Sequence, residues 1–178
     1  MAIATPYRWG KSAPPGSTLC PYCEVVYAGG PEDHVHKLVR GKEEVAIDAD
    51  GNAYLAQPAR HRILKIGAKG GVMPLCDNGQ GFADGPIATA RFNAPAGVAV
   101  DADHNVYVAD TGNQRIRRIS ANGTVVTIAG DGTAGSADGL GAKARFDSPG
   151  GLAIDAHGNL LVADTNNGRI RQIVLPAP

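Results

Sequence analysis

GVAVDADHNVYVADTGNQRIRRI, at residues 97–119, occurs in three versions along the chain and decides the fold. VAIDADGNAYLAQPARHRILKI precedes it from residue 45, and LAIDAHGNLLVADTNNGRIRQI follows it from residue 152. The aspartates that the three copies share, Asp48, Asp101 and Asp155, are 53 and 54 residues apart. This period is too long for a repeat of two helices and fits one four-stranded sheet, or blade, of a propeller. The chain is therefore predicted to be an all-β repeat protein of antiparallel blades.

Composition restricts the possible partners and locations. The 178 residues can form one domain with a substantial core, and the 17 basic and 17 acidic side chains cancel. No net field therefore draws the chain to nucleic acid or to an anionic membrane. The sequence contains neither a membrane-length apolar run nor a recognisable secretion signal. A cytoplasmic location is the default, with secretion as the alternative if N-terminal residues have been removed.

Within the middle repeat, apolar runs and turn residues predict strands at 97–101, 105–110, 115–119 and 124–128. Asp103, His104 and Asn105 are predicted to form the first turn. Ile116 and Ile119 are three residues apart, which is helical spacing. The run between turns is nevertheless too short for a stable helix, so a twisted or bulged strand is predicted there.

The long connections between repeats are themselves repeated. Residues 80–97 and 134–151 share Ala-Asp-Gly, Ala-Arg-Phe and a proline at fixed offsets. A connection of this length without regular structure is unusual, so its repetition predicts a defined shape. Phe92 and Phe146 are predicted to fill gaps between neighbouring blades. A short helical turn is predicted over residues 87–92.

The hydrophobic-Asp-x-x-x-Asn turn, the Val-Ala-Asp-Thr-x-Asn-x-Arg-Ile segments at 108–116 and 162–170, and the repeated connection resemble NHL-repeat β-propellers. The resemblance implies closed rings of about six blades, within the 4 to 8 typical of propellers. Three repeats correspond to half of such a ring. The predicted organisation is an extended arm at 1–23 and an NHL-repeat half-propeller at 24–178, with blades at about 45–79, 98–130 and 152–174 and a strand at 24–28.

A half-ring would have two open sheet edges, which natural proteins generally cover. The third repeat has three predicted strands, whereas EVVYA at 24–28 resembles a fourth strand without its blade. We expect EVVYA of one copy to add to residues 152–174 of another, giving a homodimer with two equivalent joints. The alternative is that this sequence is a fragment of a longer propeller that pairs through the same edges.

Cys20 and Cys23 form the sharpest local motif, Cys-Pro-Tyr-Cys, which looks like the redox dithiol of glutaredoxins. The surrounding sequence does not predict the strand-to-helix junction that such a dithiol requires. Zinc is a second interpretation, with Cys20, Cys23, His34 and His36 as its ligands. The favoured interpretation is ordinary reduced cysteines and no cofactor. Cys76 is predicted to be a core residue of a fourth strand.

Charged residues of the loops at 57–62, 80–96, 110–114 and 133–149 are predicted to share one face of the ring. The residues predicted to contact a ligand on this face are Arg60, His61, Asp84, Arg91, Asp110, Asp138, Arg145 and Asp164. For the aspartates at the turns we favour a structural role, in which an arginine one step into the next strand, such as Arg115 or Arg169, pairs with Asp110 or Asp164.

The favoured function is a non-enzymatic scaffold that binds a protein, peptide or small molecule, because the resemblance implies interaction platforms. No catalytic residue is assigned. The alternative is a metal-dependent propeller lyase or hydrolase with unlike ligands in the channel. RNA binding is disfavoured, since the third-strand arginines are predicted to be solvated: Arg115, Arg117, Arg118, Arg169 and Arg171. The turn histidines His104 and His157 are predicted to face solvent and not to converge on one site.

Overall fold

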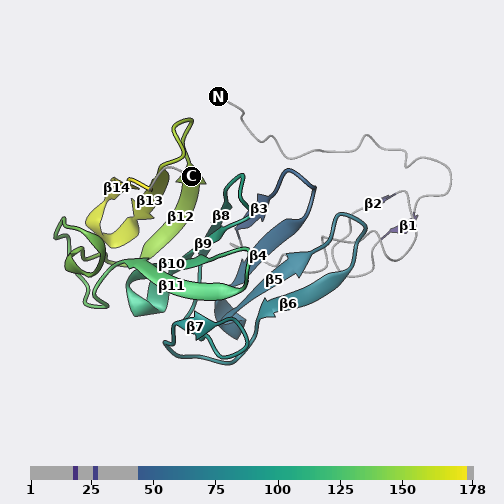
Figure 1. Cartoon of the computed structure of the whole chain (residues 1–178), viewed down its shortest axis with the longest axis horizontal. Coiled ribbons are helices and arrows are strands. Elements are labelled where there is room, and N and C mark those ends of the chain that lie inside the picture. The colour runs from purple at the N-terminus through teal and green to yellow at the C-terminus, as the bar shows by residue number, and fades with distance from the viewer. Residues whose placement is uncertain (1–17, 20–25, 28–43, 176–178) are drawn as a thin grey trace.

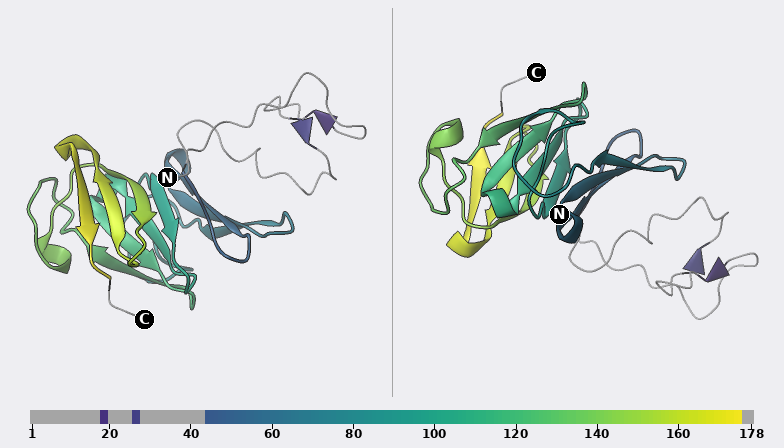
Figure 2. Two further views of the ribbon diagram at one scale, coloured as in Figure 1. Left: turned by 90° about the horizontal axis from the view of Figure 1, so that it is seen from above. Right: turned by 90° about the horizontal axis from the view of Figure 1, so that it is seen from below.

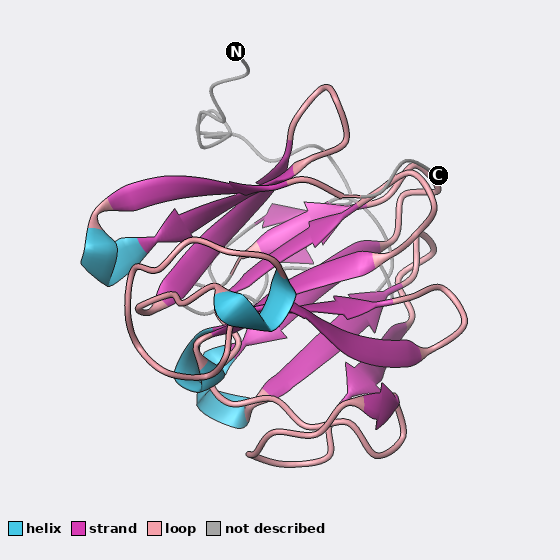
Figure 3. Cartoon of the chain, turned by 60° about the vertical axis from the view of Figure 1, so that its left-hand side comes forward, coloured by secondary structure: helices cyan, strands magenta, loops and turns pink. Residues whose placement is uncertain are grey.

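The computed structural model describes residues 18–19, 26–27 and 44–175. Strands make up the regular structure, and the helices are single 3-10 turns between strands (Figure 3). Three antiparallel sheets stand side by side in chain order (Figure 1), and two further views show the same arrangement (Figure 2). Among the described residues, no helix is long and apolar enough to span a membrane.

The sheets are β-propeller blades in which spatial order follows chain order. Blade 1 contains β3 (Val45–Ile47), β4 (Ala53–Gln57), β5 (Arg62–Ile66) and β6 (Val72–Cys76), with the turn η1 (Pro58–Arg60). Blade 2 contains β8 (Gly97–Val100), β9 (Val106–Asp110), β10 (Arg115–Ile119) and β11 (Thr124–Ala129), with η2 (Thr111–Asn113) and an outer strand, β7 (Gly85–Pro86). Blade 3 contains β12 (Pro149–Ile154), β13 (Leu160–Asp164) and β14 (Arg169–Ile173), with η3 (Gly141–Lys143) before it and η4 (Thr165–Asn167) within it.

The repeated aspartate builds the first turn of each blade. In blade 2 the Asp101 carboxylate accepts hydrogen bonds from the backbone N–H groups of Asp103 and Asn105 and from the Asn105 amide, at 2.8–2.9 Å. His104 between them takes the left-handed conformation with φ 61°. Asp48 and Asp155 form the same bonds in their blades. The Asp-x-x-x-Asn spacing therefore specifies a closed turn.

The strand predictions are confirmed to within a residue or so at each end. The helix-like spacing of isoleucines in the third strand has a structural cause, because the register between β10 and β11 shifts between Ile116 and Arg117. The same irregularity occurs between Ile63 and Leu64 in blade 1. The predicted bulge is confirmed. The predicted helical turn is present at the start of residues 87–92, where the N–H groups of Thr89 and Ala90 both donate to the carbonyl of Pro86 at 2.9 Å.

Two apolar cores lie between successive blades. The first contains Cys76, Phe92 and valines from β8, β9 and β11, and the second contains Phe146, Tyr107 and Ile116. Phe92 and Phe146 are almost fully buried, so the prediction that they fill the gaps between blades is confirmed. Cys76 is confirmed as a core residue.

The described N-terminal residues form one short sheet. β1 (Thr18–Leu19) pairs with β2 (Val26–Tyr27) in an antiparallel two-stranded sheet. β2 lies within the strand predicted at 24–28, and β1 lies within the extended arm predicted at 1–23. The pairing of residues 24–28 with a second copy remains a prediction. Cys20, Cys23, His34 and His36 lie outside the described residues.

Candidate functional site

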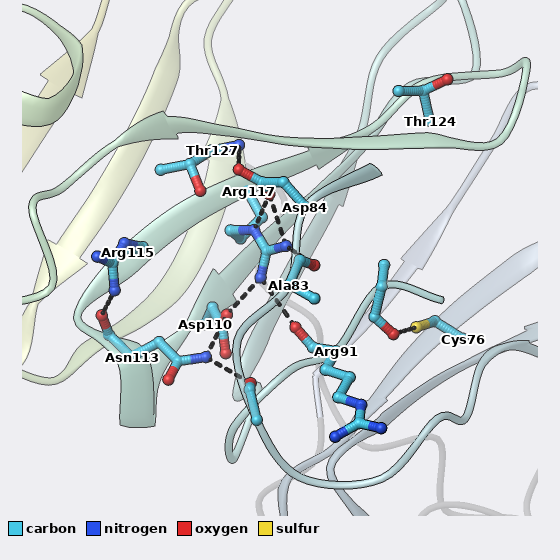
Figure 4. Close-up of polar contacts among 12 residues, drawn as sticks. Cys76, Ala83, Asp84, Arg91, Asp110, Asn113, Arg115, Arg117, Thr124 and Thr127 are labelled. Carbon is cyan, nitrogen blue, oxygen red and sulfur yellow. Dashed lines mark hydrogen bonds and ion pairs between the residues drawn. The ribbon is translucent and has the colours of Figure 1, made fainter. Parts of the chain in front are cut away.

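A buried arginine fixes the connection that enters blade 2. Arg117 is 0% exposed, and its guanidinium lies 2.8 Å from Asp110 and 2.6 Å from Asp84. It also donates to the backbone carbonyls of Ala83 and Arg91, at 2.6 and 3.0 Å (Figure 4). These four acceptors define the Arg117 cluster, in which every charge has a partner, as buried ion pairs require.

Blade 3 repeats this arrangement. Arg171 pairs with Asp138 at 2.6 Å and with Asp164 at 3.2 Å, and it donates to the carbonyls of Ala137 and Arg145. Its guanidinium lies 4.5 Å from the centre of the Phe146 ring. The repeated connection is therefore held in place by the third strand of the blade that follows it.

Blade 1 lacks both charges of the pair. Gln57 occupies the position of Asp110, and Leu64 occupies the position of Arg117; both residues are buried. Gln57 instead accepts a 2.7 Å hydrogen bond from Arg62. Because the carboxylate and the guanidinium are lost together, the pair acts as a structural unit in the other two blades.

The predicted partner of Asp110 was wrong. Arg115, one step into β10, donates to the carbonyls of Asn113 and Asp131 and lies 4.1 Å from the centre of the Phe82 ring. The prediction that Arg117 faces solvent was also wrong. Strand alternation places Arg115 and Arg117 on the same face of β10 and does not distinguish between them; blade 3 makes the same choice, since Arg171 pairs with Asp164.

The eight predicted ligand residues lie at separate places. Asp84 and Asp110 meet at Arg117, and Asp138 and Asp164 meet at Arg171. Arg145 pairs with Asp131, and the His61 ring accepts a hydrogen bond from the Ala94 N–H at 2.9 Å. Arg60 and Arg91 are exposed. As ligand contacts, the eight residues remain a prediction.

His104 bridges the turns of blades 1 and 2. Its two ring nitrogens lie 3.4 Å from Asp48 and 3.6 Å from Asp50, so the prediction that it simply faces solvent was wrong. Within the described part of the chain, these three residues are the one group with metal-ligand spacing. Burial raises the pKa of Asp48, but hydrogen bonds from Asn52, Tyr54 and His104 outweigh burial and lower it. The hydrogen bonds of the blade 1 turn and of Tyr54 already account for the buried Asp48 carboxylate, so the group carries no argument for a metal enzyme.

A larger cavity opens at the equivalent place between blades 2 and 3. The cleft beside His104 holds about 170 Å³, whereas the cleft between the turns of blades 2 and 3 holds about 490 Å³. Gly158 stands at the repeat position of His104, so no imidazole enters the second cleft. We call this cleft the turn cavity; its lining includes Asp101, Asp103, Tyr107, Arg118, Ile154, Asp155, Gly158 and Leu175.

Arg118, which lines the turn cavity, has an unsatisfied donor. Its Nε is buried and has no hydrogen-bond partner, which is rare in folded proteins. Tyr107 beside it donates to Asp101 at 2.9 Å, and burial together with this bond raises the pKa of Tyr107 to about 12. The sequence prediction missed this site, although one signal was present: a histidine in one turn and a glycine at the same place in the next.

Two further openings belong to the exposed end of blade 3. One runs along β14 and the other covers the sheet face that includes Ala153, Leu161 and Ile170, each about 560 Å³. The second also includes Glu44, whose pKa is raised by burial against the opposing effect of the Leu152 and Val98 N–H groups. In blade 2 the corresponding edge and face are covered by protein.

The NHL repeat model matches residues 92–119 and 146–173, which are the connection ends and first three strands of blades 2 and 3. This chain is an NHL-repeat protein. It is 42% identical over 96 residues to Protein SUPPRESSOR OF QUENCHING 1, chloroplastic, of Arabidopsis thaliana, a match that covers 53% of this chain and 9% of that protein. It is 36% identical over 130 residues to the peptidyl-glycine alpha-amidating monooxygenase B of Xenopus laevis, covering 71% of this chain and 14% of that protein.

Among solved structures, the NHL-repeat chain is similar to an auxiliary nutrient binding protein from Bacteroides thetaiotaomicron. The TM-score is 0.64 with 26% identity, covering 73% of this chain and 36% of the other. The chain spans only 9 to 14% of the length of its two curated relatives. Their whole-protein activities therefore do not transfer to it directly.

Proposed function

We propose that this chain is a non-enzymatic binding scaffold and that its ligand is a small zwitterion bound in the turn cavity. The observation that carries the proposal is the Arg118 side chain, which lines a cavity large enough for a metabolite and has one guanidinium nitrogen, Nε, without a hydrogen-bond partner. An unsatisfied guanidinium donor in such a place favours a ligand with an acceptor group, above all a carboxylate.

The acidic side of the turn cavity suits an ammonium group. Asp101 and Asp155 are engaged in their own turns, whereas the Asp103 side chain accepts no hydrogen bond within the described part of the chain. A ligand carboxylate at Arg118 and a ligand ammonium near Asp103 would balance both charges. A free amino acid has this pairing of groups.

The comparisons include one protein that supports binding and one that supports catalysis. The Bacteroides thetaiotaomicron neighbour is described as a nutrient binding protein. The enzyme alternative is supported by the similarity to the amidating monooxygenase. No group of described residues gives that alternative a comparable site.

The experiment is a thermal-shift screen of the full chain against the twenty amino acids, followed by calorimetric titration of the best one. At least one should raise the melting temperature, and Arg118→Gln should weaken its affinity at least tenfold, the loss expected of one charge-assisted hydrogen bond.

Gly158→His tests the place of binding. A Cβ at Gly158 meets nothing within 4 Å, and His104 adopts the same left-handed backbone region, so the imidazole can fold over the cavity as it does in the first cleft. This variant should abolish binding. Gly158→Ala is the matched control, because it carries the same backbone strain without the ring, and it should still bind. A screen without any hit, or unchanged affinity in Gly158→His, would refute the proposal.

A further inference from the structure

The outer edge of blade 3 has an open place for a fourth strand. In blades 1 and 2 the third strand pairs with a fourth, β5 with β6 and β10 with β11. Among the described residues β14 pairs with β13 alone. The groove of about 560 Å³ beside β14 lies between that strand and the loop that contains Leu140. We call it the fourth-strand groove.

Blade 2 shows what fits such a groove. There β11 lies between β10 and β7, and the Asp84 carboxylate accepts a hydrogen bond from the backbone N–H of Thr127 at 3.0 Å. Asp138, Gly139 and Leu140 stand at the repeat positions of Asp84, Gly85 and Pro86. The groove therefore already has an edge, a flanking loop and a side-chain acceptor for an incoming strand.

The adjoining sheet face is also uncovered. Ile170 is 71% exposed, whereas Ile116, at the same repeat position in blade 2, is 0% exposed because blade 3 covers it. Leu140 is 89% exposed. Ile170 is thus a large apolar side chain that is exposed at a repeat position buried in blade 2, and such a side chain marks an interface.

The chain itself carries a segment with the matching pattern. EVVYA at 24–28 aligns with TVVTI at 124–128, and among the described residues β2 within it pairs with β1 alone. β2 lies at the opposite end of the molecule from β14 in both Figure 1 and Figure 2. Blade 1, at that end, exposes apolar side chains of its own: Val45, Ile47, Val72 and Met73.

We propose that two copies of this chain assemble head to tail around a two-fold axis, with β2 of each copy adding to β14 of the other. Alignment with blade 2, where Arg118 faces Val126, puts Val26 opposite Gln172 and the Tyr27 N–H at Asp138. Both joints are then identical, which closes the assembly and removes both open edges. The inference is independent of the proposed ligand, because the groove and the turn cavity use different residues.

The test is the mass of the full-length chain by size-exclusion chromatography with light scattering at micromolar concentration. The expected mass is twice the 18.3 kDa of one chain. Val26→Pro, which removes a strand N–H, should give the monomer mass. Val26→Thr, which keeps a β-branched residue, should leave the dimer intact.

A peptide competition avoids any folding defect of the proline variant. An excess of the synthetic peptide EVVYAGG should convert the wild-type dimer to monomer, and the same peptide with proline for Val26 should not. A wild-type chain that is monomeric would overturn the proposal. So would a dimer that survives both Val26→Pro and the competing peptide, since it would use another surface.

Discussion

At the scale of single residues, Arg117 is the side chain whose replacement has the largest predictable effect. Arg117→Leu leaves Asp110 buried without its countercharge and releases two backbone carbonyls. Breaking a buried ion pair from one side destabilises a protein by about 3–5 kcal/mol. Denaturant unfolding followed by circular dichroism should show a loss of this size.

The companion variant is the combination found in blade 1. Asp110→Gln with Arg117→Leu copies Gln57 and Leu64 and removes both charges together. We expect the double variant to recover at least half of the stability that Arg117→Leu loses, so that the double-mutant cycle is strongly non-additive. Additive losses would mean that the two side chains stabilise the blade independently.

Asp48 determines a pH dependence of stability. Its pKa is lowered in the folded chain, so its contribution is present above the unfolded pKa of about 3.9 and is lost as pH falls toward the folded pKa. Wild type should exceed Asp48→Asn in unfolding free energy at pH 6. The difference should shrink below about pH 3.9. Thermal melts of wild type and Asp48→Asn from pH 7 to pH 2 measure this difference in stability. A difference that grows as the pH falls would contradict a lowered pKa for Asp48.

At the scale of elements, each connection contributes one aromatic side chain to the core between blades. Phe92→Ala should destabilise the chain by about 3–5 kcal/mol, because it empties a fully buried site. Phe82→Ala is the control from the same connection. Phe82 is half-exposed and lies against Arg115 and Arg117. Phe82→Ala should therefore lower the free energy of unfolding by only about 1 kcal/mol. If urea unfolding gave the same loss of unfolding free energy for both variants, burial of Phe92 would not be what determines its contribution to stability.

The elements themselves could be predicted from sequence because each rests on local chemistry. Asp-x-x-x-Asn encodes a turn whose bonds are made within five residues, and the strands between turns follow from apolar runs. The partner of Asp110 could not be predicted in this way. Arg115 and Arg117 are two residues apart on one strand, so local spacing does not decide between them. Arg117 also donates to carbonyls of the connection, which lie 26 and 34 residues away in sequence.

The site escaped prediction for a different reason. Two features single out the turn cavity: Gly158 in a turn leaves it without a side chain at one place, and Arg118 on β10 has an unpaired Nε. Neither residue resembles a binding motif. The sequence instead predicted ligand contacts at the repeated charged residues. A charged residue that recurs in successive blades more often stabilises the contacts of each blade.

At the scale of the whole molecule, dimerisation should make thermal stability depend on concentration. A tenfold increase in chain concentration favours the folded dimer by about 1.4 kcal/mol, which should raise the melting temperature by a few degrees. Val26→Pro should remove this dependence. Differential scanning calorimetry at two concentrations makes the comparison, and a concentration-independent wild-type midpoint would argue for a monomer.

The Arg117 cluster also sets an order of events during synthesis. Residues 83–91 leave the ribosome before the guanidinium that anchors them, and residues 137–145 likewise precede Arg171. We therefore expect each connection to lack its anchoring hydrogen bonds until the third strand of the blade that follows it has been translated. Nascent chains halted just before Arg117 and just after Ile119 should therefore differ abruptly in protease resistance across residues 80–96.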